Sequence, residues 1–152
     1  MRLAPLLLAA TAAGLGCRRA DAPVDAVIMA AVSTAYSLQD RAWDSLRIGW
    51  QGDSAMRHHH ALAYYRQAFG DSLAQFYAGY TAGGGPEKIM DVPDSIVVLS
   101  SSRDHATVLY PTPLPLQEIW RAAPYTVDDL DRIQGRWLIV HTTRVAEKPA
   151  AP

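Results

Sequence analysis

The chain has 152 residues, with 14 Lys and Arg, 15 Asp and Glu, and a single cysteine. The balanced charge excludes the basic surface that a nucleic-acid-binding domain requires, and one cysteine excludes a disulfide within the chain. A chain of this length is expected to form one domain held together by its own hydrophobic core.

The first 16 residues have the pattern of an export signal. Arg2 precedes an apolar run from Leu3 to Leu15, which is too short to span a bilayer, and Cys17 follows. We expect residues 1–16 to be removed and residues 17–23, which are mainly polar and end in proline, to form a short tether.

This segment resembles a bacterial lipoprotein signal, in which Gly16 would be the small residue before the cleavage site and Cys17 would carry the lipid. Arg18, where an Asp would retain the protein in the inner membrane, implies the periplasmic face of the outer membrane. Two acyl chains are enough for stable anchoring. The alternative is an ordinary signal peptide cleaved near Ala13 or Ala20, which would leave a free thiol.

Three helices are expected in the first half of the domain. From Val24 onward, apolar residues recur at steps of three and four, as on one face of a helix. Gly and Pro interrupt the pattern, and good N-cap residues follow two of the interruptions: Asp53 or Ser54, and Asp71 or Ser72. The expected helices are therefore 24–46, 54–69 and 72–80.

After Pro86 the period changes to two, as in β-strands. Strands are expected at 95–101 and 105–110, and a short strand at 88–92 can precede them. A hairpin follows over 125–143, because two runs of alternating residues flank a two-residue Gln-Gly turn. Helices followed by an antiparallel sheet predict an α+β domain over residues 24–145, with helices across one sheet face and a disordered tail at 146–152.

The hairpin contains the candidate catalytic residues. Pairing outward from the turn gives Arg132 with Trp137, Leu130 with Ile139, and Asp128 with His141. A carboxylate hydrogen-bonded to His141 would fix its tautomer and leave the other ring nitrogen as a general base. The alternative is that His141 lies at the rim of the sheet and Asp128 is solvated.

The run His58-His59-His60 suggests metal binding at first sight. Consecutive residues on a helix lie about 100° apart and cannot converge on one ion, since zinc sites on a helix use i and i+4 spacing. We therefore expect a solvated helix face with one inward histidine, and neither a metal site nor a cofactor.

Aromatic residues are numerous for a chain of this size, and aromatic rings with polar tips often line ligand pockets. We expect Tyr64, Tyr110 and Trp120 to line a pocket in front of Trp137 and Ile139, with Trp137 forming part of the core. The alternative is that all these rings simply fill the space between helices and sheet.

The last strand contains Gly135, Arg136, Trp137 and Ile139, which match the form G-[KR]-W-x-I, and Asp104 to Val108 has the form D-x-A-x-V. With the helices before them, these motifs resemble the NTF2-like (SnoaL-like) superfamily over most of residues 24–144. The resemblance implies a cone of helices packed on a curved sheet, and dimers through the open sheet face. The early strand that enzymes of this fold have among their helices has no counterpart in 53–83.

The sequence thus predicts a lipid-anchored envelope protein whose NTF2-like domain binds an apolar or aromatic small molecule, or a partner protein, without catalysis. The alternative is a small isomerase- or hydrolase-type enzyme with His141 as base and Asp128 as its orienting carboxylate. A third possibility is an accessory subunit of an envelope complex with exposed aromatic residues as its interface.

Overall fold

The computed structural model describes residues 23–47, 53–83, 92–93, 95–112 and 122–149. Its elements are helices α1 (Val24–Arg47), α2 (Ser54–Tyr65) and α3 (Asp71–Ala82), and strands β1 (Val97–Ser101), β2 (His105–Pro111), β3 (Tyr125–Ile133) and β4 (Arg136–Val145). The strands form one antiparallel sheet in the order β1-β2-β3-β4. The described part of the chain is therefore α+β, as predicted.

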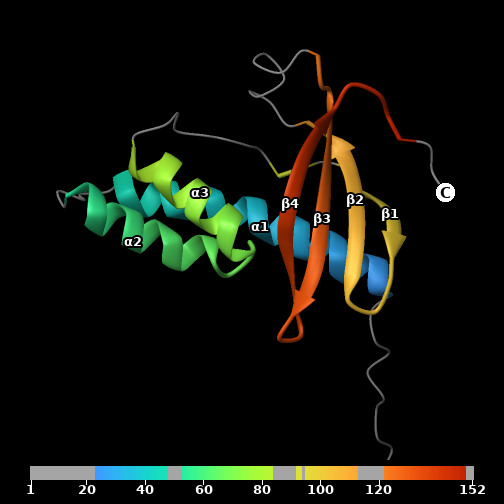
Figure 1. Ribbon diagram of the computed structural model, residues 1–152, viewed down its shortest axis with the longest axis horizontal. Coiled ribbons are helices and arrows are strands. Elements are labelled where there is room, and N and C mark those ends of the chain that lie inside the picture. The colour runs from blue at the N-terminus through green and yellow to red at the C-terminus, as the bar shows by residue number, and fades with distance from the viewer. Residues whose placement is uncertain (1–22, 48–52, 84–91, 94, 113–121, 150–152) are drawn as a thin grey trace, which may run out of the picture.

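The helices lie on one side of the sheet and beside it (Figure 1). Helix α1 crosses behind the sheet, while α2 and α3 pack against each other beside β4. The side chains of each strand alternate between the face toward α1, here called the covered face, and the opposite or open face. Covered-face positions are Ala106, Val108, Tyr110, Thr126, Asp128, Leu130 and Ile139, and open-face positions are His105, Thr107, Leu109, Asp129, Asp131 and His141.

The core is rich in aromatic rings. Helix α1 contributes a fully buried stripe at helical spacing that includes Ile28, Val32 and Tyr36. The Tyr36 and Phe69 rings meet edge to face at a centroid distance of 6.5 Å, and Phe69 also contacts Tyr77 at 5.0 Å. Such contacts join α1 to α3 through the segment between α2 and α3.

The first turn of α1 departs from the predicted stripe. Val24 and Val27 were expected on the buried face, but they are 55% and 44% exposed. Burial begins with Ile28, which has no exposed surface. The helix therefore starts one turn before its contact with the sheet.

Helix α2 begins as predicted and ends early. The Asp53 carboxylate accepts a hydrogen bond from the Met56 amide at 2.9 Å, which confirms Asp53 as N-cap. The helix was expected to continue to Phe69, but it ends at Tyr65. Phe69 instead forms a parallel bridge with Ile139 on the outer edge of β4.

Gly70 allows this close approach to β4. Its amide donates to the Ile139 carbonyl at 2.8 Å, and the Ile139 amide donates to the Ala68 carbonyl at 3.0 Å. A Cβ at position 70 would lie 3.0 Å from Val140 Cγ1. Gly70 is also the N-cap of α3, without a side-chain hydrogen bond, so the predicted caps at residues 71 and 72 are wrong.

The β3–β4 hairpin has the predicted turn and a different register beyond it. Gln134 and Gly135 have φ of 52° and 79°, the left-handed values of a two-residue hairpin turn. The pairs Arg132 with Trp137 and Leu130 with Ile139 form as predicted. A bulge between Asp129 and Leu130 then shifts the register by one residue, because Val140 has no partner on β3.

Several predicted features lie outside the described residues, among them the export signal, Cys17, Trp120 and most of the short strand at 88–92. Within the described part of the chain, no helix is long and apolar enough to cross a membrane.

Candidate functional site

Asp128 is the centre of a buried polar cluster on the covered face, and its side chain has no exposed surface. The Tyr36 and Tyr110 hydroxyls donate to its Oδ2 at 2.9 and 2.6 Å, and the Thr142 hydroxyl donates to Oδ1 at 2.7 Å. The two phenol oxygens are also in hydrogen-bond contact with each other. Both carboxyl oxygens are therefore satisfied by protein donors.

Each member of this cluster is placed by the periodicity of its own element. Tyr36 lies one helical turn after Val32 on the buried stripe of α1. Tyr110 follows Val108 at a spacing of two on β2, and the bulge in the hairpin brings Thr142 opposite Asp128. The cluster therefore joins α1, β2, β3 and β4 around one carboxyl group.

Burial dominates the acid–base behaviour of the cluster. It raises the pKa of Asp128, although hydrogen bonds from Tyr110, Thr142 and Tyr36 and the charge of Arg144 act in the opposite direction. Burial, together with the nearby Asp128 carboxylate, raises the pKa of Tyr36 and of Tyr110 well above the usual value. The two phenols consequently stay neutral hydrogen-bond donors.

A second polar strip continues along the covered face. The Arg144 Nη1 atom donates to the Thr126 hydroxyl at 2.7 Å, and the Thr126 and Thr112 hydroxyls are 3.1 Å apart. The Thr112 hydroxyl donates to the Ala123 carbonyl at 3.0 Å. These contacts hold the end of β2 against the beginning of β3.

The predicted pairing of His141 with Asp128 is wrong. The bulge pairs Asp128 with Thr142 and Asp129 with His141, so the two predicted catalytic residues lie on opposite faces of the sheet. The His141 side chain is 67% exposed, and its Nδ1 is 3.5 Å from Asp129 Oδ2. Asp129 also accepts a hydrogen bond from the Thr107 hydroxyl at 2.8 Å.

The residues predicted to line a pocket have different surroundings from one another. Ile139 and Tyr110 are 1% exposed and belong to the core. Trp137 is partly buried against that core, as predicted. Tyr64 is partly buried and meets the His60 ring at a centroid distance of 5.4 Å, and Trp120 lies outside the described residues.

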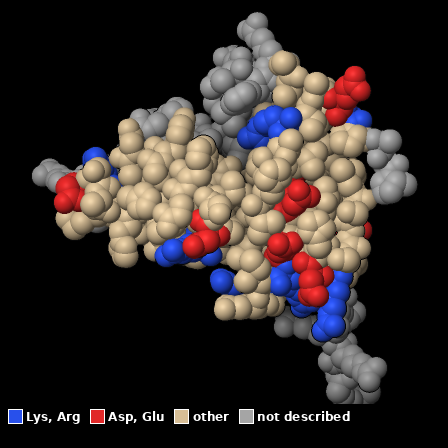
Figure 2. Space-filling model, viewed as in Figure 1, with Lys and Arg blue, Asp and Glu red and all other residues tan. Residues whose placement is uncertain are grey.

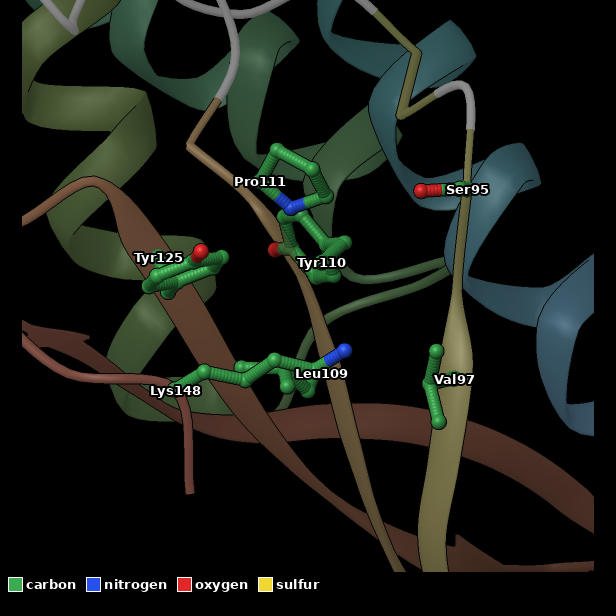
Figure 3. A pocket seen from close by; sticks show the side chains of 7 residues that line it. All are labelled: Ser95, Val97, Leu109, Tyr110, Pro111, Tyr125 and Lys148. Atoms are coloured by element: carbon green, nitrogen blue, oxygen red, sulfur yellow. The ribbon is translucent and has the colours of Figure 1, made fainter. Parts of the chain in front are cut away.

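The structure shows a small hollow at one end of the sheet (Figure 3). Of the residues predicted to line a pocket, Tyr110 lines this one, whereas the other residues around it were not predicted. The hollow has a volume of about 70 Å³ and lies where β1 begins, β2 ends and β3 begins. Val97, Leu109 and Tyr125 form apolar walls, and the Lys148 side chain extends beside Leu109. Leu109 and Pro111 are two residues apart on β2, and Pro111 pairs with Tyr125 on β3. This spacing could have indicated from the sequence that the three side chains lie on one face of the sheet, beside the hollow.

No group of three or more His, Cys, Asp and Glu side chains is placed to hold a metal ion among the described residues. The histidine run does not converge there: His59 is exposed, while His58 and His60 are partly buried.

Comparison of the chain with protein-family models, with curated proteins and with solved structures gives no match. Within the part of the chain that the structure describes, we consider two places as candidate sites, the buried Asp128 cluster and the hollow at the end of the sheet.

Proposed function

We propose that the protein is exported, is anchored through a lipid on Cys17 to the periplasmic face of the outer membrane, and binds a partner protein without catalysis. In this proposal its domain is a variant of the NTF2-like cone. Helix α1 packed on one face of an antiparallel sheet, with α2 and α3 beside β4, and the Gly135-Arg136-Trp137 start of the last strand, support that assignment.

The hollow is the observation that carries the binding proposal. Pockets for small molecules usually measure about 300–1,000 Å³, whereas this one has about 70 Å³. That volume suits a single side chain of a partner better than a free ligand. Val97, which is 42% exposed, lies beside the hollow. A partner side chain that fills a pocket at the centre of an interface commonly supplies much of the binding free energy.

The chemistry of the hollow indicates what it would accept. Leu109, Pro111 and Tyr125 provide apolar contact, and Lys148 brings a positive charge. The preferred partner segment is therefore an apolar or aromatic side chain next to a carboxylate. Figure 3 shows the Lys148 stem lying along Leu109, so its methylene groups add to the apolar wall.

The geometry gives no support to the enzyme alternative. A base oriented by a carboxylate requires hydrogen-bond contact between the two groups, and His141 is exposed on one face while Asp128 is buried on the other. Asp128 is instead held by three hydroxyl donors within the core.

Site-specific photo-crosslinking in intact cells tests the binding proposal. A benzophenone amino acid at position 97 should give one discrete adduct, and the same probe at the exposed Gln75 on α3 should give none. The substitution Ser95→Trp, which fills the hollow, should abolish the adduct. Failure to crosslink from position 97, or an adduct that survives Ser95→Trp, would contradict binding at the hollow. An adduct of twice the chain mass would identify a second copy as the partner.

Anchoring is tested separately. Replacing residues 1–17 by a signal peptide that is cleaved without lipidation should move the protein from the membrane fraction to the soluble fraction, and mass spectrometry of the native protein should find acyl chains on the N-terminal cysteine. A protein that stays with the membrane after this replacement would refute the lipid anchor.

A further inference from the structure

The end of the sheet opposite the hollow consists of two adjoining turns, here called the turn end. They are Ser102–Asp104, between β1 and β2, and Arg132–Arg136, at the tip of the β3–β4 hairpin. The Arg132 amide donates to the Asp104 carbonyl at 2.9 Å, which holds the two turns together. The turn end is therefore one continuous surface.

Three arginines are exposed on this surface: Arg103, Arg132 and Arg136. None of the three guanidinium groups forms an ion pair with another described residue. The neighbouring Asp131 carboxylate is engaged by His105 Nδ1 at 2.9 Å. Figure 2 shows basic side chains gathered at the lower end of the sheet, with acidic side chains beside them.

The tip of the hairpin also carries an exposed apolar side chain. Ile133, next to the Gln134-Gly135 turn, is 42% exposed. An exposed apolar residue at a hairpin tip, next to Arg132 in the chain and paired with Arg136, is suited to the boundary between lipid headgroups and acyl chains. Arginine also matches the geometry of phosphate oxygens better than lysine does.

The start of α1 brings this surface close to the proposed anchor. In Figure 1 the first turn of α1 lies at the same end as the β1–β2 turn, and Val24 and Val27 are exposed there. Six residues lie between Cys17 and Val24. Even a fully extended chain of that length spans at most about 25 Å.

We propose that the turn end docks on the anionic phospholipid headgroups of the bilayer that holds the Cys17 lipid, with the three arginines on phosphates and Ile133 in the interface. This inference rests on the proposed lipid anchor. It orients the domain, because the hollow lies at the opposite ends of β1, β2 and β3 and would face away from the membrane toward a partner.

The test uses the full lipidated chain in vesicles, with an environment-sensitive fluorophore on a single engineered cysteine. One variant carries the label at Ile133→Cys, and the control carries it at Gln75→Cys on α3. On vesicles that contain phosphatidylglycerol, quenching by aqueous acrylamide at position 133 should fall to less than half of that at position 75. Replacing Arg103, Arg132 and Arg136 together by Gln should restore the quenching at position 133.

Equal quenching at both positions, in protein that floats with the vesicles, would overturn docking while leaving the anchor intact. Shielding at position 133 that is as strong on pure phosphatidylcholine and insensitive to the arginine substitutions would overturn recognition of anionic headgroups. Protein that does not float, with Cys17 itself labelled, would refute the anchor and the docking with it.

Discussion

Asp128 and Asp129 are neighbours in the chain, yet the two faces of the sheet give them opposite surroundings. Asp128 is fully buried among Tyr36, Tyr110 and Thr142. Asp129 lies on the open face, where it contacts Thr107 and the exposed His141.

The comparison shows how alternation along a strand separates two carboxylates with similar sequence surroundings. A step of one residue moves a side chain from one face to the other. The burial of Asp128 raises its pKa, whereas Asp129 is partly open to solvent, with 34% of its side chain exposed. Stability should therefore depend strongly on the first carboxylate and weakly on the second.

The largest effect is expected for Asp128→Ala, which should lower the free energy of unfolding by about 3 kcal/mol, because three buried hydroxyls lose their acceptor. The measurement is urea denaturation at neutral pH. The matched control Asp129→Ala should cost at most about 1 kcal/mol. Equal losses for both variants would contradict the difference between the two faces.

The pH dependence of the free energy of unfolding provides a second way to distinguish the two carboxylates. Because burial raises the pKa of Asp128 above its ordinary value of 3.8, the protonated form favours the native state. This contribution is complete below that ordinary pKa and is lost as the pH rises through the folded-state pKa.

The Asp128→Asn variant cannot lose this proton and should cost less stability than Asp128→Ala. Its unfolding free energy, measured from about pH 4 upward, should fall less with rising pH than that of the native protein. Asp129→Asn provides the control and should keep the native slope. A slope unchanged by Asp128→Asn would show that Asp128 does not hold its proton more tightly in the folded state.

Gly70 and Gly79 provide a contrast between tight packing near the core and an open helix surface. Gly70→Ala should destabilise the protein by about 1 kcal/mol, since its Cβ would lie 3.0 Å from Val140 Cγ1. Gly79→Ala, inside α3 with no atom within 4 Å of the added Cβ, should stabilise it by about 0.5–1 kcal/mol. Thermal unfolding of both variants measures the contrast, and effects of the same sign would contradict it.

The smallest effect is expected for His141→Ala, which removes a residue that is 67% exposed. Exposed contacts between a histidine and a carboxylate contribute little, so the free energy of unfolding should change by less than about 0.5 kcal/mol. Urea denaturation measures the change, and a loss comparable to that of Asp128→Ala would show that the open face stabilises the fold more than its exposure indicates.

Much of the fold could be predicted from the periodicity of apolar residues and from residues that cap helices or form turns. The pattern from Val24 predicted a helix to residue 46, and α1 ends at Arg47. The N-cap at Asp53 and the turn at Gln134-Gly135 were also predicted, because both depend on local chemistry that a few residues determine.

The register beyond the turn could not be predicted. Leu138, Ile139 and Val140 are three consecutive apolar residues, which fit either phase of a strand, so nothing in the pattern marks the bulge. The prediction placed His141 opposite Asp128 because it assumed a regular ladder. Phe69 was similarly misplaced in a helix, because its bridge to Ile139 is a tertiary contact.

The Asp128 cluster depends on long-range contacts and was missed for that reason. Tyr36 and Asp128 are 92 residues apart in the sequence, and a tyrosine at a buried helix position indicates packing as readily as hydrogen bonding. Thr142 and Lys148 gave no signal of their own, since their roles depend on which neighbours the sheet brings to them.

The bridge between Phe69 and Ile139 also bears on self-association. An open strand edge is a template to which another chain can add. Here the chain before α3 occupies part of the β4 edge. At the other side, β1 has only five residues and a register irregularity after Val98. Both edges are thus poorly suited to growth into an intermolecular sheet, which favours a protein that stays dispersed at high concentration.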